Sequence, residues 1–315
     1  MESEKTSENM GTSQPSEPGR GALSSDGGTS LREVLARTRA LLLPKYGEGE
    51  TRALQRFMFE QLKGWTPVDL AIRQDDLVSD FILGKVNDTV NRLLHDEPIQ
   101  QIFGCVDFYG LKLKVTRDTL VPRPETAELV DIIVRENDGR DLRVLDAGTG
   151  SGCIAVALAL NLKFPEVTAI DISDGALAVA RENARQLHVN VDFRKADILA
   201  LPESLPGMQF DIIVSNPPYI AESEKPSLEA NVLDYEPATA LFVPDSDPLR
   251  FYNAILRAAA TDMLVPGGRI YFEINPLFAS KLLDNARQAG FADAAVLRDS
   301  EGRNRFLTAS KSLDN

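Results

Sequence analysis

Hydrophobic residues follow three different patterns along the chain. From Leu31 to about His95 they recur every three or four positions, which is typical of amphipathic helices packed against one another. Between Val106 and Val121 apolar and polar residues alternate around Gly110, and this pattern predicts a short β-hairpin. From Asp141 onward, short apolar runs alternate with segments of helical spacing, as in a doubly wound α/β fold with a mostly parallel sheet.

The strands and helices of the predicted sheet domain can be placed from the apolar runs. Five core strands are expected at Arg143–Asp146, Val167–Asp171, Val191–Arg194, Phe210–Ser215 and Arg269–Ile274. Helices are expected around Ile154–Asn161, Gly175–Gln186 and Leu249–Leu264, and a final pair near Ala294–Leu297 and Arg305–Ala309 predicts an antiparallel edge. Ligands bind at the carboxyl ends of such strands, so the residues that follow each strand are the candidates for chemistry.

These patterns divide the chain into four parts. Residues 1–30 are rich in Ser, Glu, Gly, Thr and Pro with almost nothing apolar, so we expect a disordered tail. Residues 31–97 form a predicted helical domain, 98–121 a β-hairpin linker, and 122–315 the sheet domain.

The charge balance bears on the kind of partner. The chain carries 34 basic and 47 acidic residues, for a formal net charge of −13. Nucleic-acid binding requires basic residues to neutralise phosphates, and the only basic clusters are weak, such as Arg303 with Arg305 beside Asp299 and Glu301. The composition therefore disfavours direct contact with nucleic acid.

Other classes are disfavoured by what the sequence lacks. No apolar run approaches the roughly 20 residues that a bilayer span needs, and the acidic, polar start does not resemble a secretory signal. Two cysteines, Cys105 and Cys153, are too few for a disulfide framework or a zinc cluster. We expect a cytoplasmic protein with reduced cysteines, no membrane contact and no metal.

Three successive strand ends carry residues suited to an adenosine. The first strand ends in VLDAGTGSG, which places Gly148, Gly150 and Gly152 before a helix, where glycines allow a ligand close to the backbone. A dinucleotide fingerprint would require glycine at position 153, which is Cys153, so NAD is disfavoured. Asp171 ends the second strand and can accept hydrogen bonds from ribose hydroxyls. The third strand region ends in Asp197 and Ile198, which could contact adenine, although Asp197 could instead be a helix N-cap.

The fourth strand runs directly into Asn216, Pro217, Pro218 and Tyr219, within FDIIVSNPPYI. This could be a stiff turn, because proline restricts the backbone and Asn favours turns.

The functional interpretation concerns a planar NH2 group, whose conjugated nitrogen is a poor nucleophile. If the Asn216 side-chain oxygen and the Pro217 carbonyl each accept one N–H, they orient the nitrogen toward a methyl donor and stabilise developing positive charge. Tyr219 could stack on the acceptor, and no strong base is needed. Accordingly, His95 and His188, both assigned to helices, have no predicted role.

The motifs together resemble the HemK/PrmC family of protein glutamine methyltransferases, which act on the GGQ glutamine of peptide chain release factors. The resemblance covers most of residues 31–310, through EPIQQIFG, FYG, LVPRPETAELV, VLDAGTGSG, AIDIS, SNPPYI and YEPATAL. It implies a Rossmann-like class I methyltransferase fold with an N-terminal helical domain that docks the protein substrate, and it implies S-adenosyl-L-methionine as the cofactor. We also expect the protein to be a monomer.

The resemblance also implies which residues form the site. The cofactor would be held by Gly148, Thr149, Gly150, Ser151, Gly152, Asp171, Asp197, Ile198 and Asn216. The glutamine amide would be gripped by Asn216, Pro217, Pro218 and Tyr219, with Arg123, Glu125 and Thr126 of the PRPET segment bordering the site. The segment PRPETAEL is also a good helix start, with Pro124 near its first position.

The chain departs from the family pattern at three places, the first of which is its long acidic and polar N-terminal tail, unlike the usual compact start. Ile198 stands where many relatives have an aromatic residue beside the adenine, and EINPLFA after the fifth strand replaces a segment that often carries glycine and glutamine. We assign EINPLFA no role from the sequence. Two other functions stay open at this point: a nucleic-acid amino methyltransferase acting on adenine N6 or guanine N2, and a non-catalytic protein that binds adenosylmethionine.

Overall fold

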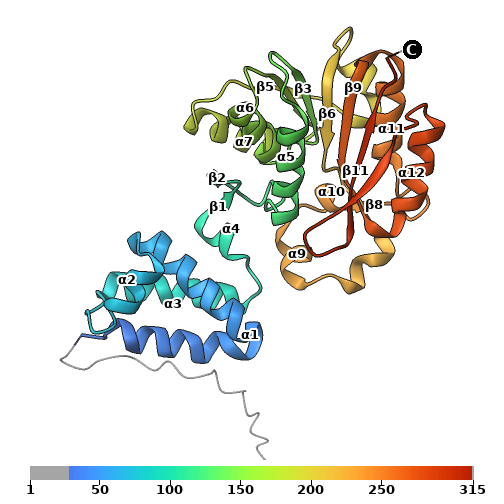
Figure 1. Ribbon diagram of the computed structural model, residues 1–315. Helices are drawn as coiled ribbons and strands as arrows, with labels where there is room; N and C mark the ends of the chain where they lie inside the picture. Colours follow the sequence, from blue (N-terminus) through green and yellow to red (C-terminus); the bar gives the residue numbers. More distant parts are fainter. Residues whose placement is uncertain (1–27, 314–315) are drawn as a thin grey trace, which may run out of the picture.

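The computed structural model describes residues 28–313, which form a helical region joined by a hairpin to a sheet domain (Figure 1). The helical region consists of α1 (Leu31–Lys63), α2 (Pro67–Ile72), α3 (Asp80–Leu94) and α4 (Ile99–Phe103). Gly47, with φ of 69° and ψ of 178°, divides α1 into two helical parts at a kink. These helices share a core of their own, in which Met58, Phe59 and Leu93 are almost fully buried. The helical spacing in the sequence arises from this core.

The disordered tail expected over residues 1–30 lies mostly outside the described residues. From residue 28 onward, the chain contacts the helical region. Val78 N–H donates to the carbonyl of Thr29 (2.9 Å), and Ser30 forms a capping box with Glu33 at the start of α1.

The hairpin consists of β1 (Cys105–Phe108) and β2 (Leu111–Lys114), paired antiparallel. Tyr109 and Gly110 connect them with φ values of 51° and 74°, as a tight turn with two left-handed residues requires. The alternation around Gly110 therefore predicted this turn. The chain from 115 to 123 contains no strand and instead runs to α5 (Pro124–Glu136), which begins with proline at its first position as predicted.

The sheet has seven strands in the order β10-β11-β9-β6-β3-β4-β5. Neighbours from β9 to β5 run parallel, and β11 pairs antiparallel with both β9 and β10, which confirms the predicted antiparallel edge. The strands are β3 (Arg143–Ala147), β4 (Glu166–Asp171), β5 (Asp192–Lys195), β6 (Phe210–Ser215), β9 (Leu264–Glu273), β10 (Ala295–Arg298) and β11 (Asn304–Ser310).

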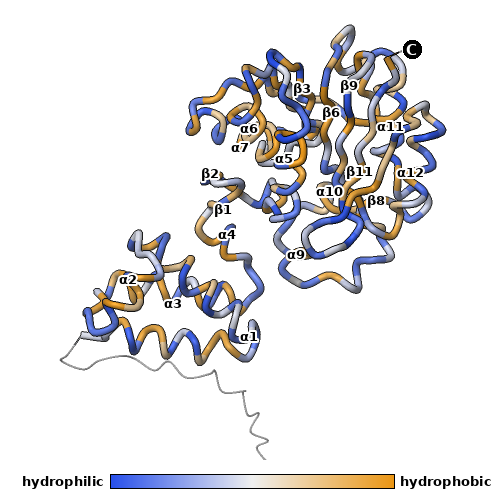
Figure 2. Tube along the Cα trace, in the orientation of Figure 1, coloured by the Kyte–Doolittle hydropathy of each residue, from blue (hydrophilic) through white to orange (hydrophobic). Residues whose placement is uncertain are grey.

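Helices cover both faces of the sheet (Figure 1). One face carries α5, α6 (Cys153–Asn161) and α7 (Asp174–Gln186), and the other carries α11 (Arg250–Ala258) and α12 (Ala279–Gln288). Successive strand residues enter opposite cores: Val144 packs on the first face and Leu145 on the second. The helix α6 is hydrophobic from Cys153 to Leu160 and buried as far as Leu158, as expected for a helix in the core (Figure 2).

The largest departures from the predicted boundaries lie at the end of the helix expected over Leu249–Leu264 and at the start of the strand after it, whereas the other predicted boundaries in the sheet domain differ by at most one residue. The helix expected over Leu249–Leu264 ends as α11 at Ala258 and continues as a π-helical turn, η3 (Ala259–Met263). Leu264 instead begins β9 and pairs with Phe210, followed by a register shift. The strand thus starts before Pro266-Gly267-Gly268, a sequence that by itself indicates a turn. The helices also end just before His95 and His188.

Between β6 and α11 lies an insertion of short elements, residues 220–243, that the sequence did not predict. It contains β7 (Ile220–Ala221), η2 (Glu222–Ser227), α9 (Ala230–Tyr235), α10 (Ala238–Leu241) and β8 (Phe242–Val243), with β7 paired to β8. The remaining short elements are η1 (Ile198–Ala200), α8 (Leu201–Ser204) and η4 (Pro276–Phe278). None of the helices in the described part of the chain is long and apolar enough to cross a membrane.

Candidate active site

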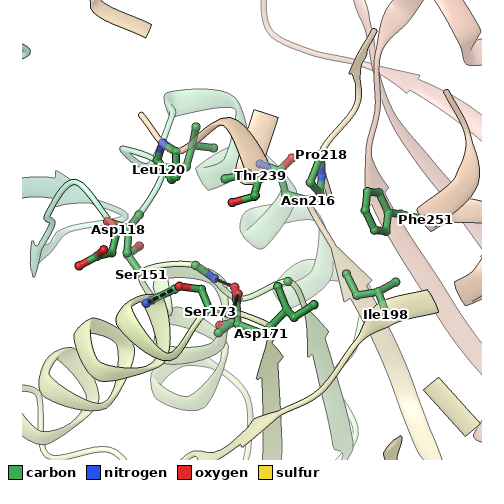
Figure 3. Close-up of a pocket in the computed structure, with 18 of the residues that line it drawn as sticks. Asp118, Leu120, Ser151, Asp171, Ser173, Ile198, Asn216, Pro218, Thr239 and Phe251 are labelled. Atoms are coloured by element: carbon green, nitrogen blue, oxygen red, sulfur yellow. Dashed lines mark hydrogen bonds between the residues drawn. The ribbon is translucent and has the colours of Figure 1, made fainter. Parts of the chain in front are cut away.

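A cavity of about 550 Å³ opens at the carboxyl ends of β3, β4 and β6 (Figure 3). Its volume lies within the range of small-molecule and cofactor sites. The walls come from residues far apart in the sequence: the glycine loop after β3, the ends of β4 and β6, the segment after β2, the insertion and the start of α11. The strand ends therefore meet where the predicted topology places a ligand.

The glycine loop forms one wall through its backbone. Gly148 N–H and Thr149 N–H both donate to the carbonyl of Ile170, which ties the loop to the end of β4. Gly148 and Gly150 have φ values of 82° and 55°, a region that favours glycine, and a Cβ on Gly148 would point at Ile198 Cδ1, 3.3 Å away. These residues and Ser151 line the cavity.

Gly152 is the predicted loop residue that does not line the cavity. It is the N-cap of α6, and a Cβ there would lie 3.0 Å from Ala180 Cβ on α7. Its φ of 80° also favours glycine. The structure therefore explains this glycine by close helix packing.

Asp171 supports the glycine loop and borders the cavity. Gly150 N–H donates to its Oδ2 and Ser173 N–H to its Oδ1, each at 2.9 Å (Figure 3). A carboxylate has about four lone-pair positions, so two remain for a ligand. Asp197 accepts from Leu199 N–H (2.8 Å), which confirms the N-cap interpretation. It also lines the cavity, beside the buried Ile198.

Two residues beneath the loop were not predicted from the sequence. Asp146 is fully buried, where its Oδ2 accepts from Thr149 Oγ1 (2.6 Å) and Ala155 N–H (3.2 Å). Burial raises the pKa of Asp146 to about 7, with a smaller contribution from the charge of Asp171. Asn183 of α7 accepts from Lys114 N–H (2.7 Å) and donates to the carbonyls of Lys114 and Ser151. It thereby joins the hairpin to the glycine loop.

The four NPPY residues point in different directions. Asn216 and Pro218 line the cavity (Figure 3), whereas Pro217 is buried and Tyr219 is not among the lining residues. The Tyr219 hydroxyl donates to Glu273 Oε1 (3.2 Å), and its carbonyl accepts from Asn275 Nδ2 (3.1 Å). In this geometry the ring is not placed to stack on an acceptor in the cavity.

Two hydrogen bonds connect Asn216 to buried residues. Its Nδ2 donates to Thr126 Oγ1 (3.3 Å), and Thr126 Oγ1 donates to Glu273 Oε2 (2.7 Å). Thr126 and Glu273 are 2% and 1% exposed. Burial raises the pKa of Glu273, and the hydrogen bond from Thr126 and the charge of Arg305 partly offset that rise.

Of the three PRPET residues predicted to border the site, Thr126 lines the cavity, whereas Arg123 and Glu125 are not among its lining residues. Glu125 pairs with Arg303 (3.1 Å) at the surface. Arg123 pairs with Glu236 of the insertion (2.5 Å), whose side chain is 1% exposed, and Glu236 Oε2 has no hydrogen-bond partner. Arg123 therefore connects the start of α5 to the insertion.

Many residues of the cavity wall were not predicted from the sequence. The segment after β2 contributes Arg117, Asp118, Thr119, Leu120 and Pro122, the insertion contributes Pro237, Thr239, Ala240 and Phe242, and α11 contributes Arg250 and Phe251. The motif YEPATAL, which supplies part of the insertion, could have pointed to this wall. Phe251 and Ile198 line the same cavity, so an aromatic face is present although position 198 is aliphatic (Figure 3).

The chain is 43% identical over 282 residues to the release factor glutamine methyltransferase of Bacteroides thetaiotaomicron, covering 89% of the chain and 100% of the relative. The chain belongs to the release factor glutamine methyltransferase family. The family member from Flavobacterium psychrophilum is 41% identical, over 79% of this chain and 87% of the relative.

Family models agree with this family, and a solved structure agrees with the fold. A model described as the PrmC N-terminal domain matches residues 33–104, and a methyltransferase domain model matches residues 138–273. The hMettl16 catalytic domain superposes with a TM-score of 0.51 at 18% identity, covering 65% of this chain and 75% of that one, and it supports the fold alone. The resemblance to the family and the class I methyltransferase fold predicted from the motifs are thus confirmed.

Proposed function

We propose that the chain transfers a methyl group from S-adenosyl-L-methionine to the side-chain amide nitrogen of the GGQ glutamine in peptide chain release factors. The observation that carries the proposal is Asn216 at the cavity wall of a member of this family, with its Nδ2 bonded to Thr126 on the protein side. The Asn216 Oδ1 is then the atom available to an NH2 group in the cavity.

The cavity suits the proposed cofactor. Gly148 leaves open the space that a Cβ would fill, and Asp171 keeps lone pairs for ribose hydroxyls. Ile198 and Phe251 offer apolar and aromatic surface for the adenine. We therefore assign cofactor binding to Gly148, Thr149, Gly150, Ser151, Asp171, Asp197, Ile198 and Phe251. Gly152 acts only through helix packing.

The residues of this chain are proposed to orient the acceptor. When bound, the cofactor supplies an electrophilic methyl group on a sulfonium centre. Asn216 Oδ1 and the carbonyl of Pro217 would each accept one N–H of the glutamine amide, which fixes the nitrogen and stabilises the positive charge that develops on it. The proton leaves after the methyl group has moved, so no strong base is required.

The charges at the cavity favour this substrate over nucleic acid. Its ionisable lining residues include the acids Asp118, Asp171 and Asp197 and the bases Arg117 and Arg250. An excess of acids suits a cationic cofactor, whereas a phosphate backbone would need an excess of bases. This agrees with the acidic net charge of the whole chain.

The helical region is proposed to dock the release factor. Its surface exposes large apolar side chains on and around α2, including Val68 (67%), Ile72 (72%) and Phe81 (71%). It also contacts the insertion directly, because Gln101 Nε2 donates to the carbonyl of Tyr235 and the Tyr235 hydroxyl donates to the carbonyl of His95. The part of the helical region around α4 and the end of α3 is thus joined to the insertion, which forms part of the cavity wall. We propose that the enzyme acts as a monomer in the cytoplasm.

The test is incubation of the purified protein with labelled adenosylmethionine and a release factor, in parallel with a copy whose GGQ glutamine is replaced. Mass spectrometry should locate the label on that glutamine and find none on the replaced copy. Label on added DNA or RNA instead, with the release factor unlabelled, would overturn the proposal in favour of a nucleic-acid methyltransferase.

A further inference from the structure

Glu273 is a buried acid that does not line the cavity, yet two hydrogen bonds connect it to Asn216. It is the last residue of β9, within the EINPLFA segment to which the sequence analysis gave no role. Its Oε2 accepts from Thr126 Oγ1 (2.7 Å), its Oε1 accepts from the Tyr219 hydroxyl (3.2 Å), and Thr126 Oγ1 in turn accepts from Asn216 Nδ2 (3.3 Å).

The protonation state of Glu273 sets the direction of every hydrogen bond in this network. An ionised carboxylate can only accept, so the hydroxyl hydrogen of Thr126 must point at Glu273. The Thr126 oxygen can then only accept from Asn216, which requires the NH2 side of the Asn216 amide to face Thr126. As a result, the Asn216 Oδ1 faces away from Thr126.

We propose that Glu273, as a carboxylate, is a positioning residue that acts through Thr126 to orient the Asn216 carboxamide, so that its oxygen accepts from the substrate amide. Its effect on catalysis rests on the proposed function. A neutral group at position 273 can donate to Thr126, whose hydroxyl is then free to donate to Asn216 Oδ1. The amide would turn over and present its NH2 to the NH2 of the acceptor, where two donors face each other.

The surroundings of Glu273 allow the carboxylate to persist in spite of burial. Thr126 of α5 and Tyr219 donate to its oxygens, and the positive charge of Arg305 on β11 favours the ionised form. Glu125 opposes it, and the Tyr252 hydroxyl of α11 donates to the Glu273 main-chain carbonyl. Burial raises the pKa of Glu273, so the positioning should fail on acidification at a higher pH than an ordinary glutamate would allow.

The kinetic test compares four variants of the full chain. Glu273→Gln and Thr126→Val remove the carboxylate and the hydroxyl with little change in shape, and each should lower kcat by about 10- to 100-fold, the scale of losing a residue that orients a functional side chain from behind. Thr126→Ser keeps the hydroxyl and should remain within about threefold of the wild type. Glu166→Gln, at the exposed start of β4, is the matched control and should leave kcat unchanged.

Two further readouts separate positioning from a structural role. The wild-type kcat should fall at acidic pH as Glu273 is protonated, and Glu273→Gln should not show this fall. The melting temperature and cofactor affinity of Glu273→Gln should stay near those of the wild type. The double variant Glu273→Gln/Thr126→Val should be no slower than the slower single variant, because both changes break one network. Two results would overturn the proposal. One is a double variant whose loss in kcat equals the product of the two single losses, and the other is the same fall of kcat with acid in the wild type and in Glu273→Gln.

A measurement without substrate keeps this inference distinct from the proposed function. The side-chain NH2 signals of Asn216, observed by NMR in selectively labelled protein and assigned by their loss in Asn216→Ser, should titrate with acid in the wild type but not in Glu273→Gln or Thr126→Val. If they titrate in this way but no release factor is methylated, the proposed function fails while the network stands. If the glutamine is methylated but the Asn216 NH2 signals respond to pH in the same way in the wild type and in Glu273→Gln, the network proposal is wrong.

Discussion

Replacement of Arg123 by alanine should destabilise the insertion, because it leaves a buried acid without its partner. The Glu236 side chain is 1% exposed and its carboxylate accepts from Arg123 at 2.5 Å, whereas the Arg123 side chain is 38% exposed. Removing one partner of a buried ion pair costs about 3–5 kcal/mol. Since water reaches Arg123 and screens the pair, we expect Arg123→Ala to lower the free energy of unfolding by about 2–3 kcal/mol.

The second substitution tests the physical cause. Glu236→Gln removes the buried charge, so the double variant Arg123→Ala/Glu236→Gln should be more stable than Arg123→Ala alone. Protonation also neutralises an unpaired Glu236, whose pKa burial already raises, so the deficit of Arg123→Ala should shrink as the pH falls toward the ordinary pKa of glutamate, about 4.3. The native variant then binds more protons than the unfolded chain, and stability rises on acidification.

Urea unfolding followed by far-UV circular dichroism measures the global effect, and hydrogen exchange of peptides covering 229–243 measures the local one. We expect faster exchange in those peptides for Arg123→Ala and recovery in the double variant. A double variant as unstable as Arg123→Ala, with no pH dependence of the difference, would refute the charge argument and leave the packing of the arginine stem as the cause.

Four further predictions concern the cavity and the glycine loop with its supporting residues. Asn216→Ala should abolish methyl transfer while calorimetry shows cofactor affinity within a modest factor of the wild type; complete loss of the cofactor would contradict this division of roles. Asp171→Ala should weaken cofactor binding much more than the chemical step, and unchanged affinity would exclude it from the cofactor site. The pKa of Asp146 near 7 means that the native state holds this proton more tightly than the unfolded chain, so its contribution to stability is complete below about pH 4 and is lost as the pH rises to about 7, by about 4 kcal/mol in all. Asp146→Asn should remove that part of the pH dependence in urea titrations, and parallel curves for the two proteins would disprove it. Gly152→Ala should cost about 1–3 kcal/mol, because alanine there is strained at positive φ and meets Ala180, whereas Gly290→Ala, at positive φ with open space, should cost less.

The sheet domain could be predicted because its strands are short, buried and apolar. Phe210–Ser215 was predicted with the observed bounds, since alternate residues enter the two cores on either side of the sheet. The start of β9 was not predicted, because Pro266-Gly267-Gly268 indicates a turn and only the pairing of Leu264 with Phe210 extends the strand past it. Sequence patterns record local preference, and this boundary depends on a partner 54 positions away.

The site was predicted where a motif follows a strand. The glycine loop, Asp171, Asp197 and Asn216 all reach the cavity for that reason. Tyr219 does not, because its hydroxyl is bonded to Glu273, which is distant in sequence. The insertion gave little signal, because its short elements are held by contacts such as Arg123 with Glu236 and have little periodicity of their own.

Asn183 restricts where the chain can be divided into separate domains. Sequence models treat the N-terminal region and the methyltransferase domain as separate modules, and a protein engineer would cut between them, near residue 120. Such a cut removes Lys114, whose main-chain N–H and carbonyl both bond to the fully buried Asn183 side chain. The excised methyltransferase domain would then carry a buried amide that has lost two of its three hydrogen bonds beneath its own glycine loop. Hybrid enzymes built from two family members should therefore exchange the hairpin together with the methyltransferase domain and place the junction before β1.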